Sequence, residues 1–211
     1  MISVIINGVE YIPKEGSCVG TMKDIDGNIY KTAVIDGKEW MLENLKVGRF
    51  RNGEAITNIT DNEFWVSCGF SAKCSYDNDV KNKHKYGCLY NWLAVDDSRG
   101  LAPEGWRIPT IDELSESVIK NPLFSARPGG YRNNNDGTFN NVGNNGNWWS
   151  STENNTSNAY NRNLNYNNSN VNSNNNTKSN GYSVRCLRDL KGNIKRLIVS
   201  SKMNFYQSFF V

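Results

Sequence analysis

The chain has 211 residues and a net charge of +3, and 37% of its residues are hydrophobic, with six Trp, ten Tyr and eight Phe. This length can bury a core without disulfide or metal staples, and the many aromatic residues argue against disorder. The charge is too small to indicate nucleic-acid binding, and no basic stretch contains interleaved aromatic residues. No apolar run approaches the length of a membrane-spanning helix. We therefore expect a soluble, loop-rich domain that neither inserts into a membrane nor binds nucleic acid.

The N-terminal residues 1–20 predict two short strands, from Ser3 to Ile6 and from Val9 to Ile12, separated by a turn at Asn7-Gly8. They form either a small hairpin or a docking segment. The first residues carry neither the positive charge nor the apolar run of a secretory leader. If the protein reaches an extracellular surface, we expect it to travel as part of an assembly, or to have lost a leader.

Two turns are strongly indicated next. Asp26-Gly27 and Asp36-Gly37 are pairs that tolerate positive φ, and the residues between them, Ile29 to Ile35, alternate as a strand. The following segment, from Glu39 to Leu45, supplies bulky side chains for a core. From Arg51 to Asn82 the chain is polar and rich in turn residues, which indicates a long ordered loop with Trp65 and Phe70 as its anchors.

An aromatic and apolar run from Tyr86 to Val95 predicts core, and a rigid turn follows at Pro103–Pro109. Thr110 then has the features of a helix N-cap, with Glu113 placed to complete a capping box. This helix is predicted to end near Lys120, because the residue before a proline disfavours helical geometry and Pro122 follows.

Close to half of the residues between Asn133 and Asn180 are asparagine. In the clearest stretch asparagine occupies every second position, at Asn161, Asn163, Asn165 and Asn167, which is the period of a strand. We expect these four to line an exposed face and the alternate residues, Tyr160, Arg162, Leu164 and Tyr166, to share the packed face. Asparagine is a poor strand former, so stability does not explain this pattern.

The segment from Gly181 to Leu187 predicts a closing, alternating strand. The tail from Lys191 to Val211 is first basic and then aromatic; it predicts an extra strand or frayed end, or a docking segment for a partner.

Five cysteines cannot all pair within one chain, and no CxxC pair indicates a zinc site. Buried thiols are favoured over a disulfide framework for Cys18, Cys68, Cys74, Cys88 and Cys186.

Seven segments, in order, resemble the Fibrobacter succinogenes major paralogous domain across Thr21 to Asp189. They are Asp24–Thr32, Trp40–Leu45, Tyr86–Trp92, Pro103–Thr110, Pro128–Arg132, Trp148–Glu153 and Tyr182–Asp189. The resemblance implies an α+β, C-type-lectin-like fold, of the kind shared with formylglycine-generating enzymes, with short, mainly antiparallel strands, one or two helices and long ordered loops. Many relatives have a cysteine at the position of Ala102, so Cys186 would lack a disulfide partner here. The tail from residue 190 to 211 lies outside the family pattern.

Such domains also serve as variable proteins of diversity-generating retroelements, in which template adenines are altered and the copy replaces the 3′ end of the gene. Asparagine codons begin with two adenines, so a lightly mutated variable region, here about residues 133–189, would contain many asparagines. The resemblance thus implies a diversified ligand-binding surface formed by Asn147, Asn161, Asn163, Asn165, Asn172, Asn174, Asn175, Asn176 and Asn180. Trp148 and Trp149 form either core or the floor of this site, and we expect at least one to be buried.

Catalysis is disfavoured. Iron-dependent relatives need several histidines, and this chain has only His84, in a lysine-rich stretch. Copper-dependent relatives need two close cysteines near the C-terminus, where only Cys186 lies. Carboxylates such as Asp112, Glu113 and Glu43 are better explained by helix capping and surface charge than by acid–base chemistry.

A calcium-dependent lectin is also disfavoured, because the loop and strand motifs that hold calcium in such lectins are absent. Asp24, Asp26 and Asn28 have the spacing that opens a calcium loop, but Gly27 and the hairpin context favour a turn. We therefore expect no metal or cofactor.

The expected function is non-enzymatic display of a ligand- or receptor-binding surface, as in a phage tail receptor-binding protein. The alternative is a secreted or cell-surface glycan-binding adhesin without diversification. Expected partners are a cell-surface protein or glycan, and a second copy of the chain or a tail or pilus assembly; the expected location is a virion tail or a cell surface. An all-asparagine surface would bind weakly, because interface hot spots are usually Trp, Tyr or Arg.

Overall fold

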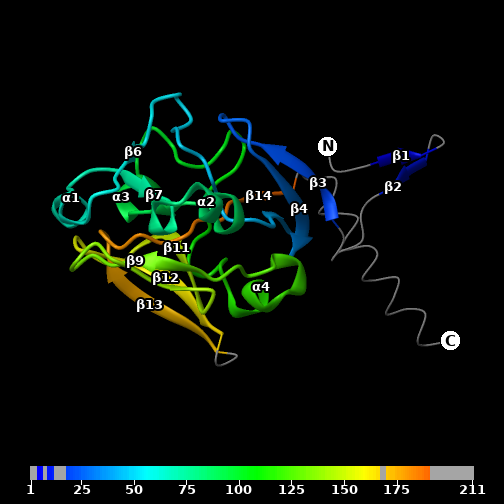
Figure 1. Cartoon of the computed structure of the whole chain (residues 1–211). Helices are drawn as coiled ribbons and strands as arrows, with labels where there is room; N and C mark the ends of the chain where they lie inside the picture. The colour runs from blue at the N-terminus through cyan, green and yellow to red at the C-terminus, as the bar shows by residue number, and fades with distance from the viewer. Residues whose placement is uncertain (1–3, 7–8, 12–17, 167–169, 191–211) are drawn as a thin grey trace.

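The computed structural model describes residues 4–6, 9–11, 18–166 and 170–190 (Figure 1). The two predicted N-terminal strands are confirmed as β1 (Val4–Ile6) and β2 (Val9–Tyr11), which pair antiparallel. The predicted turn at residues 7–8 and the C-terminal tail at 191–211 lie outside the described residues, as does Asn167.

A four-stranded antiparallel sheet brings the two ends of the described domain together. Its strand order is β14-β5-β4-β3, so the last strand of the domain pairs with an early hairpin. The strands are β3 (Cys18–Lys23), β4 (Ile29–Ile35), β5 (Lys38–Met41) and β14 (Leu187–Asp189).

Both predicted turns are present in this sheet. Asp36 and Gly37 have φ values of 48° and 72° and form a two-residue hairpin loop, as their sequence predicts. The Asp26-Gly27 turn belongs to a longer loop, because Lys23 pairs with Ile29. The Asp24 carboxylate closes that loop by accepting hydrogen bonds from the backbone N–H groups of residues 26 and 28.

The segment predicted as a long loop, from Arg51 to Asn82, is more regular than expected. Asp61 caps the first turn of a short helix by accepting from the Phe64 N–H at 2.7 Å, a start signal that the sequence prediction missed. Trp65 is buried as expected, whereas Phe70 is 44% exposed and does not anchor the segment. The elements of this region are β6 (Thr57–Asn58), α1 (Asn62–Ser67), β7 (Ala72–Cys74), η1 (Tyr76–Asn78) and α2 (Val80–Tyr86).

The run from Tyr86 to Val95 forms core, as predicted, and contains β8 (Leu89–Tyr90) and α3 (Trp92–Val95). Strand β7 pairs parallel with β6 and antiparallel with β8, so one small sheet has mixed direction.

The predicted capping box forms, but it does not start the predicted helix. The Thr110 N–H donates to Glu113 and the Glu113 N–H donates back to the Thr110 hydroxyl, which closes a single turn. The helix itself, α4 (Glu116–Lys120), begins after a second N-cap at Ser115, and η2 (Pro122–Phe124) follows it. Glu113 therefore completes the cap and also pairs with Arg107, and the helix begins only three residues later.

The asparagine-rich region forms a hairpin and a three-stranded antiparallel sheet. The hairpin is β9 (Gly129–Arg132) with β10 (Phe139–Val142). The sheet has the order β11-β12-β13, with β11 (Asn145–Glu153), β12 (Asn158–Asn165) and β13 (Val171–Thr177).

The segment after β13 was predicted to be one alternating strand, and this is wrong. Gly181, Tyr182 and Ser183 make isolated bridges to Arg132, Tyr90 and Trp148, and only its last residue, Leu187, enters β14. All residues from 181 to 187 are buried, because other segments cover both sides of this piece of chain.

Two aromatic clusters make up most of the core, and β11 lies between them. Trp149 packs with Tyr182 in one cluster, their ring centroids 4.4 Å apart, and Trp148 packs edge-on against Phe124 in the other. Gly146 leaves room for the Trp148 indole, since a Cβ atom at this position would lie 2.1 Å from the ring. Small, mainly antiparallel sheets with short helices confirm the predicted α+β class, but the described residues form four α-helices where one or two were expected.

A buried asparagine joins the two halves of the domain. The Asn44 amide donates to the Tyr86 carbonyl at 2.8 Å and to the Ser183 hydroxyl at 3.2 Å. Its oxygen accepts from the Trp148 indole at 3.0 Å and from the Arg185 guanidinium at 2.9 Å. Every hydrogen-bonding group of the side chain is therefore used, by four partners from three segments.

Arg185 is fully buried and depends on this asparagine. Its other guanidinium nitrogens donate to the carbonyls of Phe124 and Ser125, and it stacks on the Phe124 ring at 4.0 Å. Burial lowers the pKa of Arg185 to about 9, so the group is still charged at neutral pH.

Asn44→Ala should destabilise the protein by about 3–5 kcal/mol, because it removes an acceptor from a buried cation and leaves three neutral groups without partners. Urea unfolding would measure this loss. The matched control is Asn52→Ala at an exposed turn, expected to cost less than about 1 kcal/mol. Similar losses in the two variants would contradict the role assigned to Asn44.

An ion-pair cluster fixes β14 and the turn after Pro109. Glu113 receives two hydrogen bonds of 2.6 Å from Arg107 and lies 3.2 Å from Lys38, which also contacts Asp189 at 2.7 Å. The hydrogen bonds from Arg107 lower the pKa of Glu113 from 4.5 to about 2.

Because the folded-state pKa lies below the unfolded one, the stabilisation by Glu113 should be complete above pH 4.5 and disappear as the pH falls to about 2. Solvent screening reduces its size to roughly 1–2 kcal/mol. Urea unfolding should thus show Glu113→Gln less stable than wild type at pH 6 and equally stable near pH 2. Glu104→Gln, whose carboxylate is 89% exposed, should match wild type throughout. A difference for Glu113→Gln that persists at pH 2 would refute the assignment.

Candidate functional site

The three-stranded sheet places most of the predicted site asparagines on one face. Residues paired across antiparallel strands project to the same side. The register pairs Asn163 with Asn147 on one side and Asn172 on the other, and it pairs Asn161 with Trp149 and Asn174. We call this side the asparagine face. It consists of Trp149, Ala159 and Asn145, Asn147, Asn161, Asn163, Asn165, Asn172, Asn174 and Asn176.

The expected exposure of this face is wrong for its inner part. Asn161 is completely buried and Asn147 is 6% exposed. Both lie beside Trp149, whose ring packs in the first aromatic cluster, so this part of the face meets the core. Asn163 and Asn165 are half-buried. The strand period was therefore predicted correctly, but the assignment of the faces to core and solvent was not.

The opposite side of β12 was expected to pack, and it does so only in part. Leu164 packs against the second aromatic cluster, and Arg162 donates to the carbonyls of Leu114 and Ile111. Tyr160 is half-buried. Tyr166 lies beyond the end of β12 and is 78% exposed, so its predicted burial is wrong.

Asparagine amides bond to each other across the strands. Asn163 donates to Asn147 and Asn176 donates to Asn161, each at 2.8 Å. The buried Nδ2 of Asn161 has no hydrogen-bond partner in the structure. The Asn163–Asn147 and Asn176–Asn161 hydrogen bonds give the inner asparagines a structural role. Replacing one partner would leave a further buried amide group unpaired, which is destabilising.

The exposed part of the predicted site is strand β13. Asn172 and Asn174 are exposed on the asparagine face, and Asn175 is exposed on the opposite face. Asn176 is half-buried. Asn180 is buried and caps the following turn, donating to the Thr177 carbonyl and accepting from the Asn134 N–H. In Figure 1, β13 is the outermost strand of its sheet.

Trp148 and Trp149 are both completely buried, which confirms that at least one of them is core. Their indole N–H groups donate to Asn44 and to the Tyr90 carbonyl. Neither ring reaches the surface, so neither forms a solvent-accessible site floor in this structure.

An exposed aromatic pair lies on and next to α1 and was not predicted. Phe64 is 49% exposed and Phe70 44% exposed, and their ring centroids are 5.9 Å apart. Helix α1 is adjacent to the asparagine-rich region, since Trp65 donates to the Ser179 carbonyl just after β13. Isolated exposed rings are ordinary, but two in contact form a small apolar patch.

The residues weighed as metal ligands have structural surroundings. Both Asp24 oxygens accept hydrogen bonds, among them one from the Tyr30 hydroxyl at 2.7 Å, so the spacing forms a turn. His84 is exposed on α2. Within the described part of the chain, no three His, Cys, Asp or Glu side chains are placed to hold a metal ion, and no helix is long and apolar enough to cross a membrane.

Four of the five cysteines have described side chains, and all four are buried free thiols: Cys68, Cys74, Cys88 and Cys186. Ala102 and Cys186 belong to the same aromatic cluster. Burial raises the pKa of Cys74 to about 12, which keeps this thiol protonated at neutral pH.

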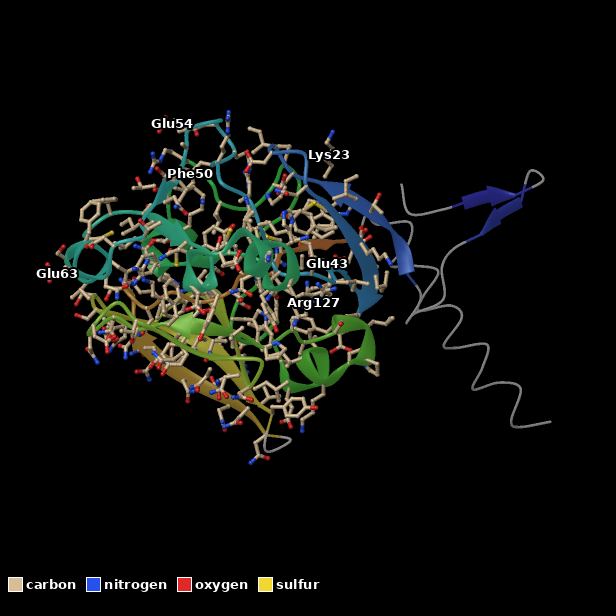
Figure 2. The ribbon with its side chains drawn as sticks, viewed as in Figure 1. Lys23, Glu43, Phe50, Glu54, Glu63 and Arg127 are labelled. Carbon is tan, nitrogen blue, oxygen red and sulfur yellow. The ribbon has the colours of Figure 1, made fainter. Side chains whose placement is uncertain are left out.

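A shallow depression of about 300 Å³ lies beside the β3–β4 loop. Lys23 and Arg49 are on its rim, and Arg51 is held there by hydrogen bonds to the Ala102 carbonyl. Figure 2 shows Lys23 at the upper edge of the molecule, whereas β13 lies at the lower edge in the same view. The depression is therefore separate from the asparagine-rich sheet.

Residues 34–123 match the family model of the Fibrobacter succinogenes major domain. The matched segment runs from β4 to η2 and contains Asn44, α4 and the early core; the sheet β11-β12-β13 lies beyond it. Comparisons with curated proteins and with solved structures found no match.

Asn161 and Asn174 face each other across β12 and β13 and allow a matched test. Asn161→Tyr should cost about 2–4 kcal/mol, because it overpacks a buried position and removes the acceptor of Asn176. Asn174→Tyr should change the stability by less than about 0.5 kcal/mol, because the side chain is exposed. Urea unfolding of both variants measures the difference. Equal losses would contradict this division of the sheet into framework and surface.

Proposed function

We propose that the protein is a non-enzymatic, C-type-lectin-like display protein whose β13 carries a diversified surface for binding a receptor or other ligand. The observation that carries the proposal is the placement of Asn172, Asn174 and Asn175 on an exposed outer strand of a sheet that is anchored in two aromatic clusters. Changes at exposed positions of a rigid framework alter the binding surface at little cost to folding.

The burial pattern narrows the set of diversified positions. Asn172, Asn174 and Asn175 can accept larger residues, and the half-buried Asn163, Asn165 and Asn176 form a border around them. Asn147, Asn161 and Asn180 are buried, so replacement there changes the framework. In this proposal they belong to the adenine-rich template region but tolerate little change.

Asparagine is a suitable starting residue for such a surface. A single adenine change in its codon gives Tyr, Asp, Ser or His, and Tyr is a frequent interface hot spot. The form described here has an amide-rich surface with little apolar area and should bind weakly by itself. Tight binding would come from forms in which one or more exposed asparagines have become aromatic.

The titratable groups also support a non-enzymatic role. Glu113 is held in ion pairs, and Glu43 accepts from the Lys31 N–H at 2.9 Å. The proposed partner is a cell-surface protein or glycan, and the proposed location is a virion tail or a cell surface.

The decisive test is to sequence the 3′ part of the gene, with its neighbourhood, in many cells or particles of the source population. We expect a nearby reverse transcriptase gene and a template copy, with replacements confined to template adenines. They should concentrate at the codons of Asn172, Asn174 and Asn175 and be rare at Asn147 and Asn161. Asparagine codons that vary no more than their neighbours would refute diversification.

The alternative is a glycan-binding adhesin without diversification, and the Phe64–Phe70 pair favours it. Sugar rings stack on exposed aromatic rings, and amides bond to their hydroxyl groups. A glycan array probed with the wild-type protein and with Phe64→Ala/Phe70→Ala separates the two functions. The adhesin predicts wild-type binding that is lost in the double variant, whereas the display protein predicts little binding by either.

A further inference from the structure

Strand β13 has an open edge. It pairs with β12 along its whole length, from Val171 opposite Leu164 to Thr177 opposite Asn158, and no other described strand lies beyond it. In an antiparallel pair, alternate residues turn their N–H and C=O groups away from the partner strand. Among the described residues, no backbone hydrogen bond joins residues 172–176 to a segment outside this pair.

Proteins usually protect such an edge, because it can pair with another strand. The common devices are a charged side chain, a proline, a bulge, or a covering loop or helix. Strand β13 contains no charged residue and no proline, and its register with β12 is continuous. Four successive residues, Asn172 to Asn175, are exposed, so both faces of this part of the strand are accessible.

The sequence of β13 is close to a palindrome in side-chain type, centred on Asn174. Asn172 and Asn176 are equidistant from this centre, as are Ser173 and Asn175. The strand ends in β-branched residues, Val171 and Thr177. Two antiparallel copies would thus place asparagine opposite asparagine on the asparagine face, where amides can donate and accept reciprocally, and no like charges would meet.

We propose that β13 pairs antiparallel with β13 of a second copy of the chain, about a twofold axis at Asn174. The two three-stranded sheets then form one six-stranded sheet, and the interface is self-complementary, as twofold symmetry requires. The exposed asparagines of the two copies become neighbours on one surface. The small polar interface makes this a weak dimer whose population depends on concentration. The proposal does not depend on diversification or on any ligand.

The test is sedimentation velocity of the full chain from about 10 µM to about 1 mM, a range that brackets weak association. The wild-type mass should rise from one chain towards two. Two double variants at exposed positions test the register: Ser173→Glu with Asn175→Lys, and Ser173→Glu with Asn175→Glu. In both variants the new carboxylate at position 173 lies opposite the Arg162 cation of β12. Because this placement is favourable, both monomers should keep the fold, and circular dichroism checks that they do.

In the proposed register residue 173 lies opposite residue 175 of the second copy. The Glu/Lys variant thus forms two attractive pairs and should dimerise at least as well as wild type. The Glu/Glu variant forms two repulsive pairs and should dimerise roughly tenfold more weakly. A wild-type protein that stays monomeric up to about 1 mM would overturn the proposal. The β13 edge would then be open to pairing only with a strand of another protein. Equal association of the two variants would place the interface elsewhere.

Discussion

The hydrogen bonds of Asn44 are the interaction on which the rest of the structure depends. The Asn44 oxygen accepts hydrogen bonds from the Arg185 guanidinium and the Trp148 indole. Its nitrogen donates to the Tyr86 carbonyl and the Ser183 hydroxyl. A fully satisfied buried network fixes the relative positions of its members, whereas one with a missing partner is costly. The early hairpin, the central core segment and the closing segment of the domain are therefore positioned together by a single side chain.

Strand β11 anchors the asparagine-rich sheet to this core. Trp148 and Trp149 extend from opposite sides of the strand into separate aromatic clusters, so β11 cannot shift without disrupting one of them. Burial then decreases across the sheet: Asn161 on β12 is covered and Asn174 beside it on β13 is exposed. This gradient separates buried from exposed positions within a set of chemically identical residues. Strand β13 is also an uncharged edge strand. Its exposure, which suits it to side-chain variation, also leaves its backbone able to pair with another strand.

The family match covers residues 34–123, from β4 to η2, and the asparagine-rich sheet lies outside it. The matched segment contributes Asn44, which accepts hydrogen bonds from Trp148 and Arg185 of the later part. The unmatched sheet is thus bound to the matched framework by its inner strand, while its outer strand contributes little to the core. Sequence change at β13 is therefore compatible with the same fold, which is the physical basis of the proposed function.

The sequence by itself determined the local features whose causes lie within a few residues. It determined the Asp36-Gly37 turn because positive φ is needed there, the Thr110–Glu113 cap, and the strand period of β12. Only the tertiary structure decided that the capped turn stops and that the helix begins after a second N-cap at Ser115. It also decided which asparagines are exposed. A period of two assigns residues to two faces, but which face meets the core depends on Trp149 and on segments distant in sequence.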